Sequence, residues 1–187
     1  ELKKLTKSSA FIKIFKDEIG LKLLEIIFPQ LKNLQNLKKL NSYALKNLSK
    51  IDFIFLLSLM IVDGSDNADY FIYKFNISKK DQKRLKVIDF FYKENTSIKN
   101  FTEKNFNEIF YFNGRQAVID IINFKLFTSK TVEKKLLKLA ELYKDKIIPT
   151  LPIGANVLMS KYKIPEGKLL GIKLKLIEET WVQNSFQ

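Results

Sequence analysis

The chain has 187 residues, a net charge of +13 and neither cysteine nor histidine. The missing residue types exclude disulfides, thiolate and histidine-based metal sites, and Ser-His-Asp or Cys-His catalysis. A hydrophobic content of 46% is typical of a globular protein, and the length is sufficient for one or two helical domains.

The basic excess favours a polyanionic partner such as RNA. The competing explanation is compositional. Arg84 and Arg115 are the arginines of a chain otherwise rich in lysine, asparagine, isoleucine and phenylalanine. This composition is typical of an AT-rich genome, so codon bias accounts for part of the charge.

Nothing at the start of the sequence has the pattern of a signal peptide. The longest apolar run, from Phe53 to Val62, is too short to span a bilayer. We therefore expect a cytoplasmic protein without a membrane partner.

The first fifty residues predict short helices. Residues 1–5 start abruptly without a cap, as in the middle of a helix, and we expect a fragment boundary there. Ser8 or Ser9 is expected to cap a helix that runs to Ile19 and ends at Gly20. A second helix is predicted from Leu21 to Phe28, before Pro29, and residues 31–48 are basic and weakly amphipathic.

Residues 51–62 are apolar nearly all round, which predicts a buried core helix. The following Asp63-Gly64-Ser65-Asp66 allows a carboxylate metal site with Asp69, or the Gly-Ser and Asp-x-Asp motif of a nucleotidyltransferase. The nucleotidyltransferase interpretation is excluded, because that motif follows a strand and needs two Asp separated by one residue. We favour a turn that caps a helix over residues 68–75.

Asn76-Ile77-Ser78 is expected to cap a helix over residues 79–92, with Ser78 and Asp81 as a capping box. Four basic residues lie in the first turns of this helix: Lys79, Lys80, Lys83 and Arg84. Cations oppose the helix dipole at this end, and a bound phosphate would offset that cost. A solvated face is the alternative, and the residues alone leave both open.

After a loop over residues 98–102, an aromatic-rich helix is predicted over residues 106–112, stopped by Asn113-Gly114. Its aromatics (Phe106, Phe110, Tyr111 and Phe112) can stack on bases, but at helical spacing they are more often core. Helices over residues 115–127 and 131–146 follow. Helix after helix, without a sustained period-two segment, predicts an all-α array of short helices with no substantial sheet.

The C-terminal stretch holds the clearest signals. Extended residues 148–153 precede a short helix to Lys163, and Pro165-Glu166-Gly167 predicts a second helix start. Gly171 inside that helix suggests close backbone approach. One apolar face is expected from Leu170, Leu174, Ile177 and Trp181. The free N–H groups at the helix start, beside Lys168, can hold a phosphate.

Ten residues stand in order here: Pro152, Ile153, Leu158, Pro165, Gly167, Gly171, Leu174, Lys175, Glu178 and Trp181. This pattern resembles the C-terminal end of bacterial class II tRNA nucleotidyltransferases (CCA-adding enzymes) and their poly(A) polymerase relatives. Two positions depart from it. Ala155 stands where the family has Gly, and Val157 where it has Asp, so the role of that Asp is not carried over.

The resemblance implies the end of the neck and the first body helices in residues 1–50, a helical body in 51–148 and a helical tail in 149–187. The family's head, with its Mg²⁺-binding Asp-x-Asp pair, and the neck's Glu-Asp-x-x-Arg motif are missing from the sequence. We therefore expect no catalytic or metal residues, no cofactor and no activity in this chain alone. The whole enzyme would use Mg²⁺, CTP and ATP to add CCA to tRNA 3′ ends.

The implied partners are the missing head domain and tRNA, gripped at its acceptor stem and T-arm. The expected RNA contacts are Lys79, Lys80, Lys83, Arg84, Lys161, Lys163, Lys168, Lys173 and Lys175. Two alternatives remain. One is the corresponding region of a poly(A) polymerase, and the other is a basic helical module that binds proteins.

Overall fold

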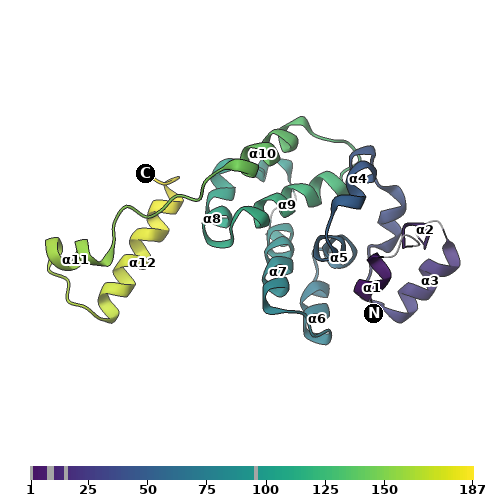
Figure 1. Cartoon of the computed structure of the whole chain (residues 1–187), viewed down its shortest axis with the longest axis horizontal. Coiled ribbons are helices and arrows are strands. Elements are labelled where there is room, and N and C mark those ends of the chain that lie inside the picture. Colours follow the sequence, from purple (N-terminus) through teal and green to yellow (C-terminus); the bar gives the residue numbers. More distant parts are fainter. Residues whose placement is uncertain (1, 8–10, 15–16, 95–96) are drawn as a thin grey trace.

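The computed structural model describes residues 2–7, 11–14, 17–94 and 97–187 (Figure 1). Over these ranges the chain is a succession of helices without a strand, which confirms the predicted all-α class. The α-helices are α1 (Leu2–Lys7), α2 (Phe11–Ile14), α3 (Glu18–Ile27), α4 (Ser42–Asn47), α5 (Phe53–Ile61), α6 (Asn67–Lys74), α7 (Lys79–Glu94), α8 (Glu103–Asn113), α9 (Arg115–Thr128), α10 (Lys134–Asp145), α11 (Ala155–Tyr162) and α12 (Lys168–Gln183). Short 3-10 helices lie between some of them: η1 (Leu34–Lys39), η2 (Leu48–Lys50) and η3 (Ile98–Asn100).

Side-chain oxygens cap several of these helices. Asp17 caps α3, Asp52 caps α5 and Thr102 caps α8, each by accepting a hydrogen bond from a first-turn backbone N–H at 2.9 to 3.3 Å. Each cap satisfies donors that have no partner within the helix. The helix starts are thus set by local chemistry.

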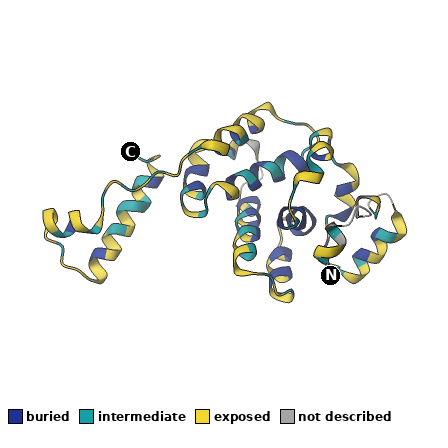
Figure 2. Ribbon diagram, viewed as in Figure 1, coloured by how far each residue is buried: buried dark blue, intermediate teal, exposed yellow. Residues whose placement is uncertain are grey.

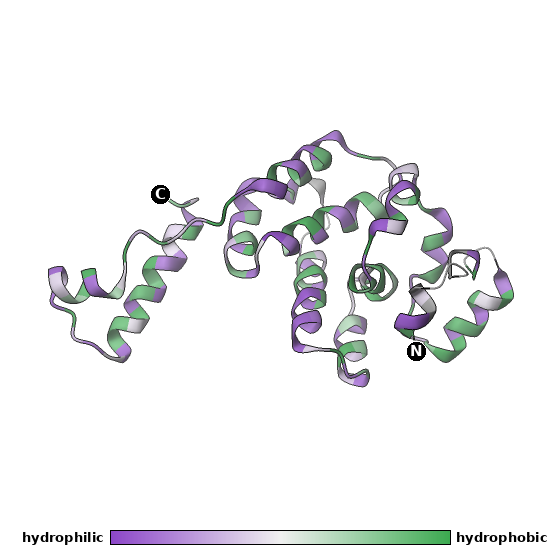
Figure 3. Ribbon diagram, viewed as in Figure 1, coloured by the Kyte–Doolittle hydropathy of each residue, from purple (hydrophilic) through white to green (hydrophobic). Residues whose placement is uncertain are grey.

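Helix α5 is the centre of the body. It packs against α1, α6, α7, α9 and η1. Its residues from Ile54 to Ile61 are buried, and Figures 2 and 3 show it dark blue and hydrophobic around its circumference. A helix that is apolar all round belongs inside a core, so the core helix predicted over residues 51–62 is confirmed, with the helix itself limited to Phe53–Ile61 and exposed Asp52 as its cap.

A cluster of aromatic rings joins α7, α8 and α10. The rings of Phe91 and Phe106 have centroids 5.5 Å apart, and Phe106 meets the ring of Tyr143 edge-on at 5.9 Å. Phe101 lies 5.3 Å from Phe91. The four side chains are at most 2% exposed. The core interpretation of the α8 aromatics therefore holds for Phe106, and also for the fully buried Phe110.

Helices α11 and α12 form a hairpin at one end of the molecule, which the chain reaches through an extended segment after α10 (Figure 1). Buried side chains from Leu21 to Tyr143 make one hydrophobic cluster, whereas Leu158, Leu170 and Val182 of the tail are buried outside it. The tail is otherwise mostly exposed (Figure 2).

Near the N-terminus the structure corrects one expectation. The predicted caps Ser8 and Ser9 lie outside the described residues, and the expected helix to Ile19 is divided between α2 and α3. Gly20 does not end a helix but lies inside α3. A Cβ at Gly20 would meet the Asp17 carboxylate at 2.9 Å, so the cap side chain explains the glycine.

The remaining differences concern loops and the tail. The predicted basic stretch of residues 31–48 contains η1 and α4 and reaches the first residue of η2. Asn41 caps α4 and also donates to the carbonyls of Leu126 and Ser129 at 2.7 and 2.8 Å. In the tail, α12 begins at Lys168, just after the predicted start. The close approach expected at Gly171 is absent, since no atom other than its chain neighbours and the backbone of its own helix lies within 4 Å of a Cβ built there.

No helix within the described ranges combines the length and apolar character that a membrane span requires.

Candidate nucleic-acid interface

The start of α7 presents lysines to solvent. The predicted capping box is confirmed in part: Ser78 Oγ accepts from the Asp81 backbone N–H at 3.3 Å, but Asp81 Oδ2 accepts from the Ser78 hydroxyl at 2.8 Å and not from the Ser78 backbone N–H. Lys79, Lys80 and Lys83 are exposed. Lys83 Nζ donates to the backbone carbonyl of Phe112, at the end of α8, at 3.3 Å.

The side chain of Arg84, the next residue, points toward α5 and α9 and not toward solvent. Its guanidinium forms ion pairs with Asp52 at 2.7 Å and with Asp120 of α9, with a second nitrogen 2.9 Å from Asp120 Oδ1. Asp120 is 2% exposed, and burial raises its pKa although Arg84 and Gln116 act in the opposite direction. Arg84 therefore joins α5, α7 and α9, and it lies apart from the exposed lysines.

Helices α7, α8 and α12 enclose a groove of about 1320 Å³, here called the α7–α12 groove. Its lining brings together Lys79 and Lys83 from α7 and Lys175 from α12, all expected from the sequence. It adds Lys86 and Lys104, which sequence reasoning missed.

Spacing could have found Lys86, because residues 79, 83 and 86 share one helical face. Lys104 carries no such signal, because it reaches the groove only through the packing of α8. Lys80 is exposed but does not line the groove.

Polar and aromatic contacts hold α12 against α8. The Tyr111 hydroxyl donates to Glu178 Oε1 at 2.6 Å, and this bond is the first cause of the raised pKa of Tyr111. Trp181 meets Tyr111 with ring centroids 5.8 Å apart, and Phe186 lies 5.1 Å from Trp181. Val182 is buried beside them. This docking places Lys175 opposite the lysines of α7.

The other tail lysines lie on the α11–α12 hairpin, away from the groove lining: Lys161, Lys163, Lys168 and Lys173. All are exposed, and none forms an ion pair within the part of the chain that the structure describes. Lys163 ends α11 with a left-handed backbone (φ 57°). Lys168 is the first residue of α12.

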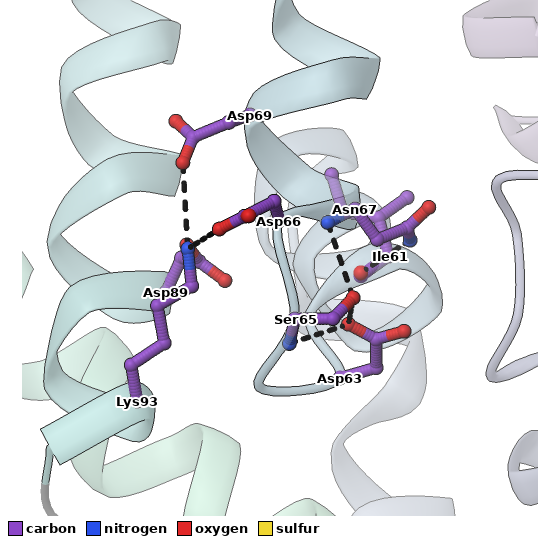
Figure 4. A network of polar contacts seen from close by, with 8 residues as sticks. All are labelled: Ile61, Asp63, Ser65, Asp66, Asn67, Asp69, Asp89 and Lys93. Carbon is purple, nitrogen blue, oxygen red and sulfur yellow. Dashed lines mark hydrogen bonds and ion pairs between the residues drawn. The ribbon is translucent and has the colours of Figure 1, made fainter.

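The acidic turn after α5 is organised internally (Figure 4). Asp63 Oδ1 accepts hydrogen bonds from the Ser65 backbone N–H and hydroxyl at 3.0 and 2.6 Å. The segment is thus the predicted turn, but the expected cap of the next helix is not formed by Asp or Asn. Asp66 at the N-cap position of α6 accepts no cap hydrogen bond, and Ser65 Oγ instead accepts one from the Asn67 N–H at 3.2 Å. Asp66 and Asp69 face Lys93 of α7, whose ammonium lies 3.1 and 3.4 Å from their oxygens.

Lys93 also lies 2.9 Å from the buried carboxylate of Asp89 (Figure 4). Burial raises the pKa of Asp89, and Lys93 opposes that effect. The ammonium group of Lys93 therefore forms ion pairs with all three carboxylates. Among the described residues no group of three or more acidic side chains is arranged to hold a metal ion.

Comparisons with known protein families, curated proteins and solved structures find no match to this chain. A proposal for its function rests on the chain's own residues: the α7–α12 groove, the exposed tail lysines and the ordered C-terminal motif.

Proposed function

We propose that this chain binds tRNA, as the helical body and tail of a CCA-adding tRNA nucleotidyltransferase. The observation that carries the proposal is the α7–α12 groove, where lysines of three helices converge beside a tail with further exposed lysines. Lysine side chains on separate helices can follow the phosphates of a folded RNA, with recognition by shape and charge.

The ordered C-terminal motif supports the same proposal. Glu178 and Trp181 of that motif are the residues that dock α12 on α8 through Tyr111. They therefore set the position of the tail lysines relative to the body. In this role the chain grips the acceptor stem and T-arm, while nucleotide transfer belongs to a head domain that carries the Asp-x-Asp pair.

The test is a salt titration of tRNA binding to the 187-residue chain. Binding should fall steeply with salt, by a slope of about 0.9 for each phosphate neutralised. Replacing the five tail lysines (Lys161, Lys163, Lys168, Lys173 and Lys175) with glutamine should weaken binding and flatten the slope by about one unit at most for each contact.

A matched control replaces five lysines in and beside α10, which contributes nothing to the groove lining: Lys130, Lys134, Lys135, Lys138 and Lys144. This control has the same net charge, so it separates a located interface from general attraction. Equal losses in both variants, or none in the tail variant, would refute the role of the tail.

A protein-interaction module is the second candidate, favoured by apolar side chains exposed along α12. Leu169, Ile172 and Leu176 are 53%, 56% and 62% exposed. A partner bound through such a face would be held by apolar burial, and its affinity would change little with salt. Absence of tRNA binding even at low salt would favour this candidate.

A further inference from the structure

We propose that the α7–α12 groove binds single-stranded RNA, with Phe90 and Phe112 as platforms on which unpaired bases stack. The inference rests on the proposed RNA-binding function and deepens it. Gripping tRNA by shape and phosphate does not require any contact with base faces, so the groove adds a distinct mode of recognition.

Three helix faces form the groove. Residues 79, 83, 86 and 90 recur at helical spacing along α7, and residues 105, 108, 109 and 112 do so along α8. Both helices pack on α9, and α12 packs on α8 and contributes the third side of the groove. The groove of about 1320 Å³ is larger than the pockets of about 300–1,000 Å³ that enclose one small molecule. It therefore suits a segment of polymer.

The charge of the groove suits phosphate. Lys79, Lys86 and Lys104 line it and form no ion pair or hydrogen bond with any other residue that the structure describes. Lys175 pairs with Glu179 at 3.6 Å. The lysines outnumber the two glutamates of the lining, Glu108 and Glu179, so a polyanion is favoured.

Two exposed phenylalanines distinguish single strands from duplexes. Phe90 is 69% exposed and Phe112 is 42% exposed, whereas Phe91 and Phe110 on the same helices are nearly or fully buried. Both exposed rings line the groove among the lysines. Base pairs inside a duplex have no free face for an aromatic ring, but unpaired bases do, and aromatic–base stacking tolerates any sequence.

The stacking test compares F90A/F112A with the unaltered chain for a labelled oligouridylate of about twelve nucleotides, within the site sizes of single-strand-binding folds. Each ring that stacks on a base should contribute about a five- to 150-fold gain in affinity. The variant should lose that affinity without a change in its salt slope, because no charge is removed. Affinity for an RNA duplex should stay unchanged.

Two further variants separate stacking from other effects. F90W/F112W keeps aromatic faces and should retain binding. The control Y70A/Y73A removes aromatics of α6 that are 52% and 89% exposed outside the groove, and should bind like the unaltered chain.

Removing lysines of the groove should change the salt dependence of binding, which removing its phenylalanine rings should leave unchanged. K86Q/K104Q should flatten the salt slope for the oligouridylate by about 0.7 for each lysine that contacts a phosphate. The two kinds of variant therefore separate stacking from charge.

The outcomes distinguish this inference from the proposed function. A chain that binds tRNA but not the oligouridylate, or an F90A/F112A variant that binds the oligouridylate normally, would overturn the groove inference alone. Equal losses for duplex and single strand would overturn it too, because stacking would not be the cause. Binding of neither tRNA nor the oligouridylate would overturn both.

Discussion

Arg84 is expected to stabilise the fold and to contribute little to RNA affinity. Its guanidinium bridges Asp52, the cap of α5, and Asp120 of α9. In Arg84→Met the stem of the side chain is kept and the charge is removed. Asp120, 2% exposed, would then be buried without its cation.

Removing one partner of a buried ion pair typically costs about 3–5 kcal/mol. Asp120 keeps a hydrogen bond from Gln116 at 2.9 Å, and the side chain of Asp52 is 54% exposed, so solvent screens its part of the cluster. We therefore expect a loss near the lower end, about 3 kcal/mol. At about 2–4 °C per kcal/mol for a chain of this size, Tm should fall by about 6–12 °C.

The loss should also depend on pH. Burial already raises the pKa of Asp120 with Arg84 present, and removing the cation raises it further. A carboxyl whose pKa is raised in the folded state binds more protons there than in the unfolded state, so stability falls as pH rises. The destabilisation of Arg84→Met should thus be largest at neutral pH and shrink toward pH 4, near the unfolded pKa of Asp of about 3.9.

Urea unfolding followed by circular dichroism measures these free energies. Arg115→Met is the matched control. Arg115 is exposed, and its only hydrogen bond within the described residues goes to the carbonyl of Lys146 at 3.2 Å, so a change within about 0.5 kcal/mol is expected. Adding Asp120→Asn to Arg84→Met should recover part of the loss at neutral pH. A loss below about 1 kcal/mol, or one independent of pH, would refute the reasoning.

Three further changes test other parts of the structure. Gly171→Ala should raise the free energy of unfolding by about 0.5–1 kcal/mol, because open space surrounds this helical position; a loss would show that the backbone needs glycine. Burial alone would raise the pKa of Asp52, but bonds from the Phe55 N–H and Arg84 outweigh it and lower that pKa. The advantage of the natural chain over Asp52→Asn should therefore be present at pH 7 and disappear as pH falls below about 4, in urea titrations over a pH series. Trp181→Ala should weaken tail docking by about 1–3 kcal/mol and speed proteolysis of residues 146–154, whereas the exposed Leu176→Ala should not.

Local signals were sufficient for most helices. Ser78 is a short polar side chain directly before a predicted helix, and its hydroxyl accepts from a first-turn N–H regardless of the rest of the chain. Asp52 carries the same signal, but the helix predicted over residues 51–62 included it, whereas the structure has it as the cap of α5. The continuous apolar composition of α5 predicts its burial in the same way, because such a helix has no polar face to leave in water. Gly20 is the informative exception, since its reason is contact with the Asp17 cap and not a chain break.

The sequence by itself determined the all-α class, the basic character and most of the lysines proposed to contact RNA. Only the tertiary structure decided which basic side chains line the same groove. Lys83 and Arg84 are neighbours in the chain, yet one lines the groove and the other pairs with buried Asp120, because successive residues on a helix point in different directions. Lys104 and Lys175 share the groove only because α8 and α12 pack together through Tyr111, Glu178 and Trp181. Contacts between residues so distant in the chain leave no local periodicity from which they could be read.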